Sequence, residues 1–134
     1  MSTTTPATIE LETQSARQIV DVTERVEAAI RGASSGSCHL FLKHTTAGLM
    51  VVTNEAGVAE DIMDILATLT PPKSYRHASQ AHVAAHFLSA LAGPSLTVPV
   101  RDGKLSLGKF QRIVLVEFEG PRQREIEIRL LASG

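Results

Sequence analysis

The sequence predicts an α+β fold: one compact domain with a mostly antiparallel β-sheet or sandwich and about three helices. Strand-like segments outnumber helical ones, and the helices do not alternate regularly with the strands, which disfavours a parallel βαβ arrangement. The length of 134 residues suits one domain. We therefore expect a loose N-terminus over residues 1–7 and a single domain over residues 8–134.

The first half of the chain predicts four strands and one helix. Four segments alternate polar and apolar residues or are apolar and partly β-branched, as strands are: 8–12, 19–22, 39–42 and 49–53. Thr23 is expected to cap a helix, because Val26, Ala29 and Ile30 then fall on one helical face.

Two further helices are predicted in the middle of the chain. Residues 58–69 place their apolar side chains on one helical stripe, and Pro71-Pro72 ends that helix. Residues 82–91 have a similar pattern, closed by Gly93-Pro94. Both helices therefore present an apolar face for packing against the sheet.

The C-terminal third predicts the rest of the sheet. Residues 95–100 and 105–107 form a hairpin around Asp102-Gly103. Residues 112–118 are nearly all apolar, as expected for a central strand covered on both faces. Residues 125–130 alternate strictly, which predicts a half-buried strand.

Composition and charge exclude several classes of function. Hydrophobic residues make up 43% and charged residues 20%, which indicates a globular chain. The formal net charge is −1 and the basic residues are scattered, so we predict no nucleic-acid or membrane partner. There is no signal peptide pattern and no apolar run of about 18 residues. The single cysteine, Cys38, suits a reducing compartment, and we predict a cytoplasmic protein.

Polar groups follow two neighbouring apolar strands and predict a small-molecule site. His44, Thr45 and Thr46 follow the strand at 39–42, and Asn54 follows the strand at 49–53. His44 falls on the core side of its strand, where a histidine is either a hydrogen-bonded core residue or part of a site. The threonine backbone N–H groups are candidates for holding a phosphate.

Histidines and carboxylates offer possible metal ligands. His82 and His86 lie at i and i+4 on one helix face, either as solvated residues or as ligands that share a metal. His77 is a further candidate metal ligand. Glu55 and Asp61 flank a helix start, where they either favour the helix dipole or bind a hard cation such as Mg²⁺. The metal is predicted to be Mg²⁺ or Zn²⁺.

Glu117 is the one carboxylate in the most apolar strand. Burial of an ionised carboxylate requires a partner. We expect that partner to be Arg122, after the Gly120-Pro121 turn, or a bound metal, so that Glu117 is either part of a structural pair or a site carboxylate.

Four blocks of sequence, taken in order, resemble the YjbQ family (UPF0047 type), an uncharacterised-protein group also called secondary thiamine-phosphate synthase. The blocks are His44-Thr45-Thr46-Ala47 with Asn54-Glu55 and Glu60-Asp61; Tyr75-Arg76-His77; Ala85-His86 through Gly93-Pro94 to Val100; and Gly103 through Gln111 to Arg122. The resemblance covers residue 22 to the C-terminus.

The resemblance implies a homotrimer and a set of site residues. It implies an activity that joins a pyrimidine pyrophosphate to a thiazole phosphate to form thiamine phosphate. The family site positions correspond to His44, Thr45, Asn54, Glu55, Asp61, His77, His86, Gln111 and Glu117.

We accordingly predict an enzyme of thiamine-phosphate-synthase type that acts on a small phosphorylated ligand. His44, His86 and Glu117 are its candidate catalytic residues. The candidate phosphate-binding residues are Thr45, Thr46, Asn54, Lys109, Gln111 and Arg122, and the candidate metal ligands are Glu55, Asp61, His77, His82 and His86. The alternative is a non-catalytic metal- or anion-binding trimer that uses the histidines.

The sequence also departs from the family pattern near its proposed site. The stretch 78–85 is short and lacks the usual acid, carboxylates or amides are missing after Asn54-Glu55, and Lys109-Phe110 replaces a Thr-Trp pair. Fewer carboxylates weaken Mg²⁺ binding, because Mg²⁺ relies on carboxylates and phosphate oxygens. We therefore expect thiamine-phosphate-forming activity that is weak or absent.

Overall fold

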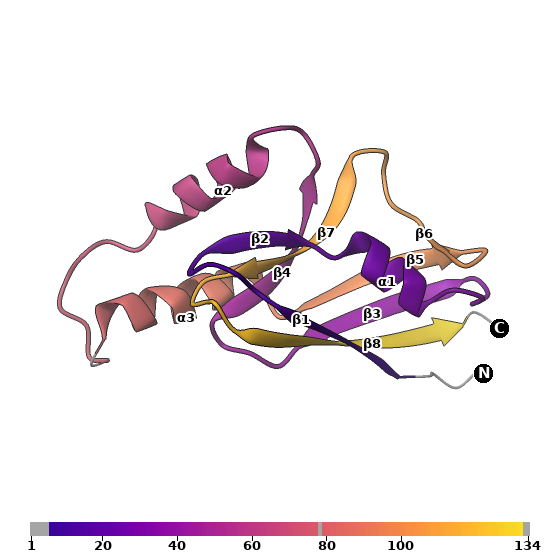
Figure 1. Ribbon diagram of the computed structural model, residues 1–134, viewed down its shortest axis with the longest axis horizontal. Coiled ribbons are helices and arrows are strands. Elements are labelled where there is room, and N and C mark those ends of the chain that lie inside the picture. Colours follow the sequence, from indigo (N-terminus) through magenta and orange to yellow (C-terminus); the bar gives the residue numbers. More distant parts are fainter. Residues whose placement is uncertain (1–5, 78, 133–134) are drawn as a thin grey trace.

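The computed structural model describes residues 6–77 and 79–132 as two packed antiparallel sheets with three helices (Figure 1). The elements run in this order along the chain: β1 Ala7–Glu12, β2 Gln18–Asp21, α1 Thr23–Ala29, β3 Gly36–Leu42, β4 Ala47–Thr53, α2 Val58–Ala67, α3 Gln80–Ala92, β5 Ser95–Arg101, β6 Lys104–Leu105, β7 Gln111–Glu117 and β8 Gln123–Ala132. The predicted α+β class with three helices and antiparallel sheets is confirmed. Of the N-terminus expected to be loose, residues 1–5 lie outside the described residues and Ala7 already belongs to β1.

The strands form a five-stranded sheet in the order β1-β8-β3-β5-β6 and a three-stranded sheet in the order β2-β7-β4. The main core lies between the two sheets, where the inward side chains of β3 meet those of β7: Cys38, Leu40, Leu42, Ile113 and Leu115. Burial of this apolar surface is the main stabilising contribution to the fold.

A second apolar cluster lies on the other face of the three-stranded sheet. Val114 and Val116 of β7 pack there against Leu66 of α2 and Leu88 of α3. Both faces of β7 are therefore covered, as its uninterrupted apolar run predicts. The molecule thus has three layers: the larger sheet, the smaller sheet, and the pair α2 and α3 (Figure 1).

Thr23 has a different role from the one expected. It is the first residue of α1 rather than its cap, which is Val22. Its hydroxyl accepts a hydrogen bond from the Ile113 N–H at 2.8 Å and faces the Ile113 carbonyl oxygen at 3.3 Å. Thr23 therefore attaches α1 to β7, a long-range contact that helical periodicity cannot indicate.

The hairpin between β5 and β6 turns where expected. Asp102 and Gly103 both have positive φ, 51° and 77°, as a type I′ turn requires. Asp-Gly suits this turn because both residues tolerate the left-handed region. The second strand is shorter than predicted and ends at Leu105.

Candidate functional site

His44, Thr45 and Thr46 lie in the connection between β3 and β4. This connection enters β4 at the end of the smaller sheet where β7 ends. Ala47 is the register partner of Glu117, and the Phe118 N–H donates to the Thr46 carbonyl oxygen at 3.1 Å. The polar residues that follow β3 thus lie beside the end of β7.

Helix α3 brings His86 to this connection. The Ser89 hydroxyl donates to the Ala47 carbonyl oxygen at 2.6 Å, which joins α3 to β4. Gly48 permits the close approach, since a Cβ atom at this position would lie 2.6 Å from the Ala92 Cβ. His86 Nδ1 lies 2.9 Å from the Thr45 carbonyl oxygen. A carbonyl oxygen can only accept, so Nδ1 carries the proton and the Nε2 lone pair of a neutral His86 ring is available.

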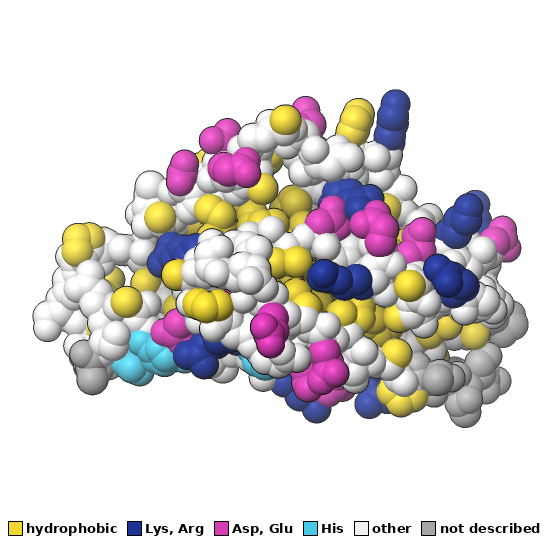
Figure 2. All heavy atoms as spheres, viewed as in Figure 1, with side chains coloured by type: hydrophobic (Ala, Val, Ile, Leu, Met, Phe, Trp, Pro, Cys, Tyr) yellow, Lys and Arg dark blue, Asp and Glu magenta, His cyan; other side chains and the backbone are white. Residues whose placement is uncertain are grey.

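His77, His82 and His86 form a cluster, hereafter the histidine cluster. One ligand atom of each ring lies within 4.8 Å of the others, and the His82 and His86 ring centroids are 4.4 Å apart. Among residues 6–77 and 79–132, it is the one group of three or more potential ligands so close together. Figure 2 shows histidine side chains at the surface beside acidic and basic ones. His77 is exposed and both His82 and His86 are half-buried, so the cluster is accessible from solvent.

Glu119 fixes the orientation of His82. The Nδ1 atom of His82 is hydrogen-bonded to the carboxylate oxygen Oε2 of Glu119. Because Nδ1 donates to the carboxylate, Nε2 of a neutral His82 is also available. Metal-binding histidines commonly have such a carboxylate or carbonyl on the other ring nitrogen. Two of the three rings thus have an orientation suited to a metal ion.

His77 is held less firmly than the other two histidines. Its side chain is exposed, and its Nδ1 accepts a hydrogen bond from the Ser79 backbone N–H at 3.2 Å, which the ring must release if Nδ1 is to bind a metal. Ligands around tetrahedral zinc lie about 3.3 Å apart, given Zn–N distances of about 2.0–2.1 Å. The three ligand atoms, which lie within 4.8 Å of one another, must therefore move closer together to complete a three-histidine site.

Glu117 has a partner other than the one expected. Its fully buried carboxylate pairs with Arg124, which is 3% exposed, and the Arg124 Nε lies 2.8 Å from Oε1. The expectation of Arg122 is wrong, because that side chain lies at the surface and pairs with Glu119. Arg124 was missed although a signal was present: in the strict alternation of β8 it occupies an inward position, which demands a buried counter-charge.

The buried pair is fully hydrogen-bonded. Besides Arg124, the Glu117 carboxylate accepts from the Thr13 hydroxyl at 2.8 Å and from the Glu119 N–H at 2.9 Å. Burial raises the pKa of Glu117, but the hydrogen bonds from Arg124, the Glu119 N–H and Thr13 outweigh it, so the pKa lies below its ordinary value. Glu117 is therefore ionised at neutral pH.

This direction of shift predicts a pH dependence of stability. A carboxylate whose pKa is lowered by folding stabilises the protein above its unfolded pKa, and this contribution is lost as the pH falls through the folded pKa. In the metal-free protein we expect wild type to exceed Glu117→Gln in unfolding free energy by a constant amount above the ordinary pKa of 4.5. Below that pH, the difference in unfolding free energy between wild type and Glu117→Gln should become smaller. Urea unfolding at a series of pH values measures this, and a difference that is unchanged at about pH 3 would contradict it.

His44 lies beside the histidine cluster without joining it. Its Nε2 accepts a hydrogen bond from the Glu125 backbone N–H at 3.2 Å. Burial and the nearby Arg124 lower the pKa of His44, partly opposed by Glu125 and Glu117. The ring is therefore neutral at pH 7.

One cavity of about 560 Å³ joins His44 to His86. Its remaining lining is mainly apolar and includes Lys43 as its one cation among the described residues: Phe41, Leu42, Lys43, Thr45, Ser89, Ala90 and Pro94. The two histidines, which are 42 positions apart in sequence, thus share a cavity as predicted. Its size and composition are those of a small-molecule pocket.

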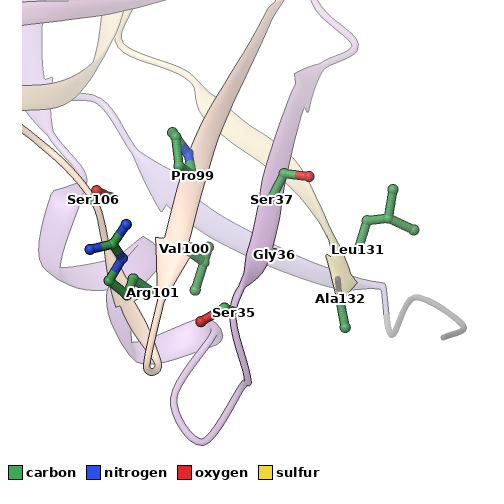
Figure 3. A pocket seen from close by; sticks show the side chains of 9 residues that line it. All are labelled: Ser35, Gly36, Ser37, Pro99, Val100, Arg101, Ser106, Leu131 and Ala132. Atoms are coloured by element: carbon green, nitrogen blue, oxygen red, sulfur yellow. The ribbon is translucent and has the colours of Figure 1, made fainter. Parts of the chain in front are cut away.

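Another cavity, of about 470 Å³, lies between β3, β5 and the end of β8 (Figure 3). Arg101 is the one charged side chain among its described lining residues, and no predicted site residue lines it. Its lining offers neither histidine nor carboxylate. The cavity beside the histidine cluster is therefore the better candidate.

The remaining predicted site residues lie at the other end of the smaller sheet. Thr53 is the register partner of Gln111, and the Asn54 N–H donates to the Phe110 carbonyl oxygen at 2.9 Å. This pairing is six residues along the ladder from Ala47 and Glu117, about 20 Å away. Within one chain, these residues therefore lie apart from the histidine cluster: Asn54, Glu55, Lys109 and Gln111.

Asp61 is not a member of the histidine cluster either. It belongs to the first turn of α2, where its N–H donates to the Gly57 carbonyl oxygen at 3.1 Å. This placement fits the helix-dipole alternative considered for it above.

No helix of the described part of the chain has the length and hydropathy needed to cross a membrane.

Comparisons with known proteins give a consistent result. A family model described as "UPF0047 protein YjbQ-like" matches residues 7–133. The chain is similar to a UPF0047 protein of Archaeoglobus fulgidus, with 37% identity over 123 residues, which are 90% of this chain and 97% of that protein. A UPF0047 protein of Mycobacterium tuberculosis is 43% identical over 112 residues, covering 80% and 84%. The crystal structure of a YbjQ-like protein of unknown function from Sulfolobus solfataricus matches with a TM-score of 0.90 at 32% identity, covering 97% of this chain and 98% of that one.

Proposed function

The chain belongs to the YjbQ-like UPF0047 family, and on that premise we propose that it binds a divalent transition-metal ion at His77, His82 and His86. The observation that carries the proposal is the orientation of two rings: Nδ1 of His82 donates to Glu119 and Nδ1 of His86 donates to the Thr45 carbonyl. Both Nε2 lone pairs are thereby free for a metal.

Zinc fits the histidine cluster better than magnesium. Neutral imidazole is a good ligand for zinc, copper and nickel, whereas Mg²⁺ takes oxygen ligands in octahedral geometry. The candidate oxygen ligands Glu55 and Asp61 are not members of the cluster. Zinc with three protein ligands keeps an open fourth position, at which it activates water or polarises a ligand oxygen.

We propose that a small anionic ligand, such as a phosphorylated compound, takes this fourth position. The cavity shared by His44 and His86 lies next to the cluster and supplies Lys43 as a cation. Its apolar lining suits the ring or chain of such a ligand. In this proposal Glu117 supports the site and does not bind the ligand, because its buried carboxylate already accepts hydrogen bonds from Arg124, Thr13 and the Glu119 N–H.

The test is a calorimetric titration of metal-stripped protein with Zn²⁺, followed by titration of the zinc-loaded protein with Mg²⁺. We expect one Zn²⁺ per chain and no displacement of zinc by millimolar Mg²⁺. Absence of zinc uptake, or ready displacement by Mg²⁺, would contradict the proposal.

An enzyme of thiamine-phosphate-synthase type is the second candidate. It is favoured by the common cavity of His44 and His86, which suits a proton donor beside a phosphate. Against it, Lys109 and Gln111 lie at the far end of β7 within the chain. We expect turnover of the pyrimidine pyrophosphate and thiazole phosphate to be weak or absent. A direct assay for thiamine phosphate measures it, and robust Mg²⁺-dependent turnover would contradict this expectation.

We further propose that the protein is a homotrimer. The proposal is supported by large apolar side chains that the single chain leaves exposed on α2 and α3 and just after α2: Ile65, Phe87, Leu91 and Leu69. Exposed apolar surface of this kind marks interaction sites. Light scattering at micromolar concentration should give about three times the chain mass of 14.4 kDa. A mass equal to that of one chain would contradict the trimer.

We also propose that the protein is cytoplasmic. It is supported by Cys38, a free thiol buried in the core, which suits a reducing compartment.

A further inference from the structure

We infer that the buried Glu117–Arg124 pair is the common support of the histidine cluster, with both members acting as positioning residues for His82 and His86. The inference rests on the proposed metal site and adds to it two residues that touch neither the metal nor its ligand. The pair reaches the two histidines by separate routes.

The first route runs from Glu117 through Glu119 to His82. Glu117 Oε2 accepts from the Glu119 backbone N–H at 2.9 Å, which fixes the backbone where the Glu119 side chain begins. Arg122 holds the same residue from the solvent side, donating from Nε to the Glu119 carbonyl at 2.8 Å and from a terminal nitrogen to Oε1 at 3.2 Å. The remaining oxygen, Oε2, is then directed at His82 Nδ1.

The second route runs from Arg124 through Thr46 to His86. One terminal nitrogen of Arg124 donates to the Thr46 hydroxyl at 2.8 Å and to the Thr46 carbonyl at 3.1 Å. These bonds fix the peptide next to Thr45, whose carbonyl accepts from His86 Nδ1 at 2.9 Å. The orientation of His86 thus depends on a guanidinium that never touches it.

The carboxylate of Glu117 takes part in both routes because each of its two oxygens accepts two hydrogen bonds. Oε1 accepts from Thr13 and from Arg124 Nε, and Oε2 accepts from the Glu119 N–H and from an Arg124 terminal nitrogen. A glutamine at this position would turn an amide NH₂ toward two donors in either orientation. Glu117→Gln therefore breaks at least one route while it keeps the shape of the side chain.

Two variants and one matched control test the inference. Glu117→Gln breaks the support directly, and Thr46→Val removes one acceptor of Arg124 without changing the side-chain volume much. Thr23→Val is the control: Thr23 and Thr46 are each 6% exposed, and the Thr23 hydroxyl bonds to Ile113 at the opposite end of β7. All three variants lose a buried hydrogen bond, but only the first two disturb the route to a histidine.

The measurements are zinc affinity by chelator competition and the visible absorption of the Co²⁺-loaded protein. We expect Glu117→Gln to weaken zinc binding about 10–100-fold, the usual cost of losing support outside the ligands. Thr46→Val should change in the same direction, and both should alter the Co²⁺ bands. Thr23→Val should lower the melting temperature but leave zinc affinity and the Co²⁺ spectrum as in wild type.

The outcomes separate the two proposals. A wild-type protein that takes up no zinc overturns the metal site itself. A wild type that binds zinc, with Thr46→Val and Glu117→Gln binding within about twofold of the Thr23→Val control, overturns the support role alone. If Glu117→Gln does not fold, Thr46→Val against Thr23→Val decides the question with the same two measurements.

Discussion

Replacing His86 with alanine is expected to weaken zinc binding by at least about 100-fold, because a direct ligand contributes more than the groups that orient it. The variant removes the Nε2 lone pair and also frees the Thr45 carbonyl. Chelator competition with metal-stripped protein measures the loss. Stability of the metal-free protein should change little, since His86 is only partly buried.

His39→Ala is the matched control for this variant. His39 is an exposed histidine on β3 whose Nδ1 lies 3.0 Å from the Thr97 hydroxyl, and it is not a member of the histidine cluster. Its removal should leave zinc affinity unchanged. If His86→Ala and His39→Ala bind zinc equally well, the ion is not held by the cluster.

Replacing Arg124 with methionine is expected to cost about 3–5 kcal/mol of unfolding free energy, because it leaves the Glu117 carboxylate buried without a counter-charge. Methionine keeps an unbranched apolar stem like that of arginine and removes the guanidinium. Urea unfolding of metal-free protein at neutral pH measures the loss, so that metal binding does not contribute.

Arg112→Met provides the comparison for the ion pair. Arg112 pairs with Asp21 and Glu24, whose side chains are much more exposed than that of Glu117. Loss of such a surface pair should cost no more than about 1 kcal/mol. Equal costs for the two arginine variants would show that the buried pair is no more important to stability than a surface one.

The fold followed from the sequence because its patterns are local. The alternation in 125–130 and the continuous apolar run in 112–118 each lie within one segment, and both segments form strands, although β8 extends beyond the predicted segment at both ends. Asp102-Gly103 turned where the dipeptide indicated. The role of Thr23 was the exception, since its hydroxyl bonds to a strand 90 residues away.

The site was predictable only in part, because its geometry depends on the register between distant strands. The i, i+4 spacing of His82 and His86 indicated a shared face, and those rings do lie together with His77. Nearness in sequence suggested Arg122 as the partner of Glu117, but the inward alternation of β8 selects Arg124 instead. Glu119 was missed because a carboxylate before a Gly-Pro turn resembles any solvated residue.

The register between β4 and β7 also explains why some of the predicted site residues lie far from the histidine cluster. Ala47 pairs with Glu117 while Thr53 pairs with Gln111, so the residues near Asn54 and Lys109 fall at the opposite end of β7. Nothing in the local sequence sets the pairing of β4 with β7. The antiparallel ladder that sets it forms only in the folded chain.

The most direct test of the three-histidine site is zinc K-edge X-ray absorption of protein loaded with one equivalent of Zn²⁺. The proposal predicts a four-coordinate zinc with three imidazole nitrogens at about 2.0–2.1 Å and one oxygen from water or a small anion. A spectrum that shows at most one imidazole, or coordination by oxygen alone, would place the ion elsewhere and contradict the account.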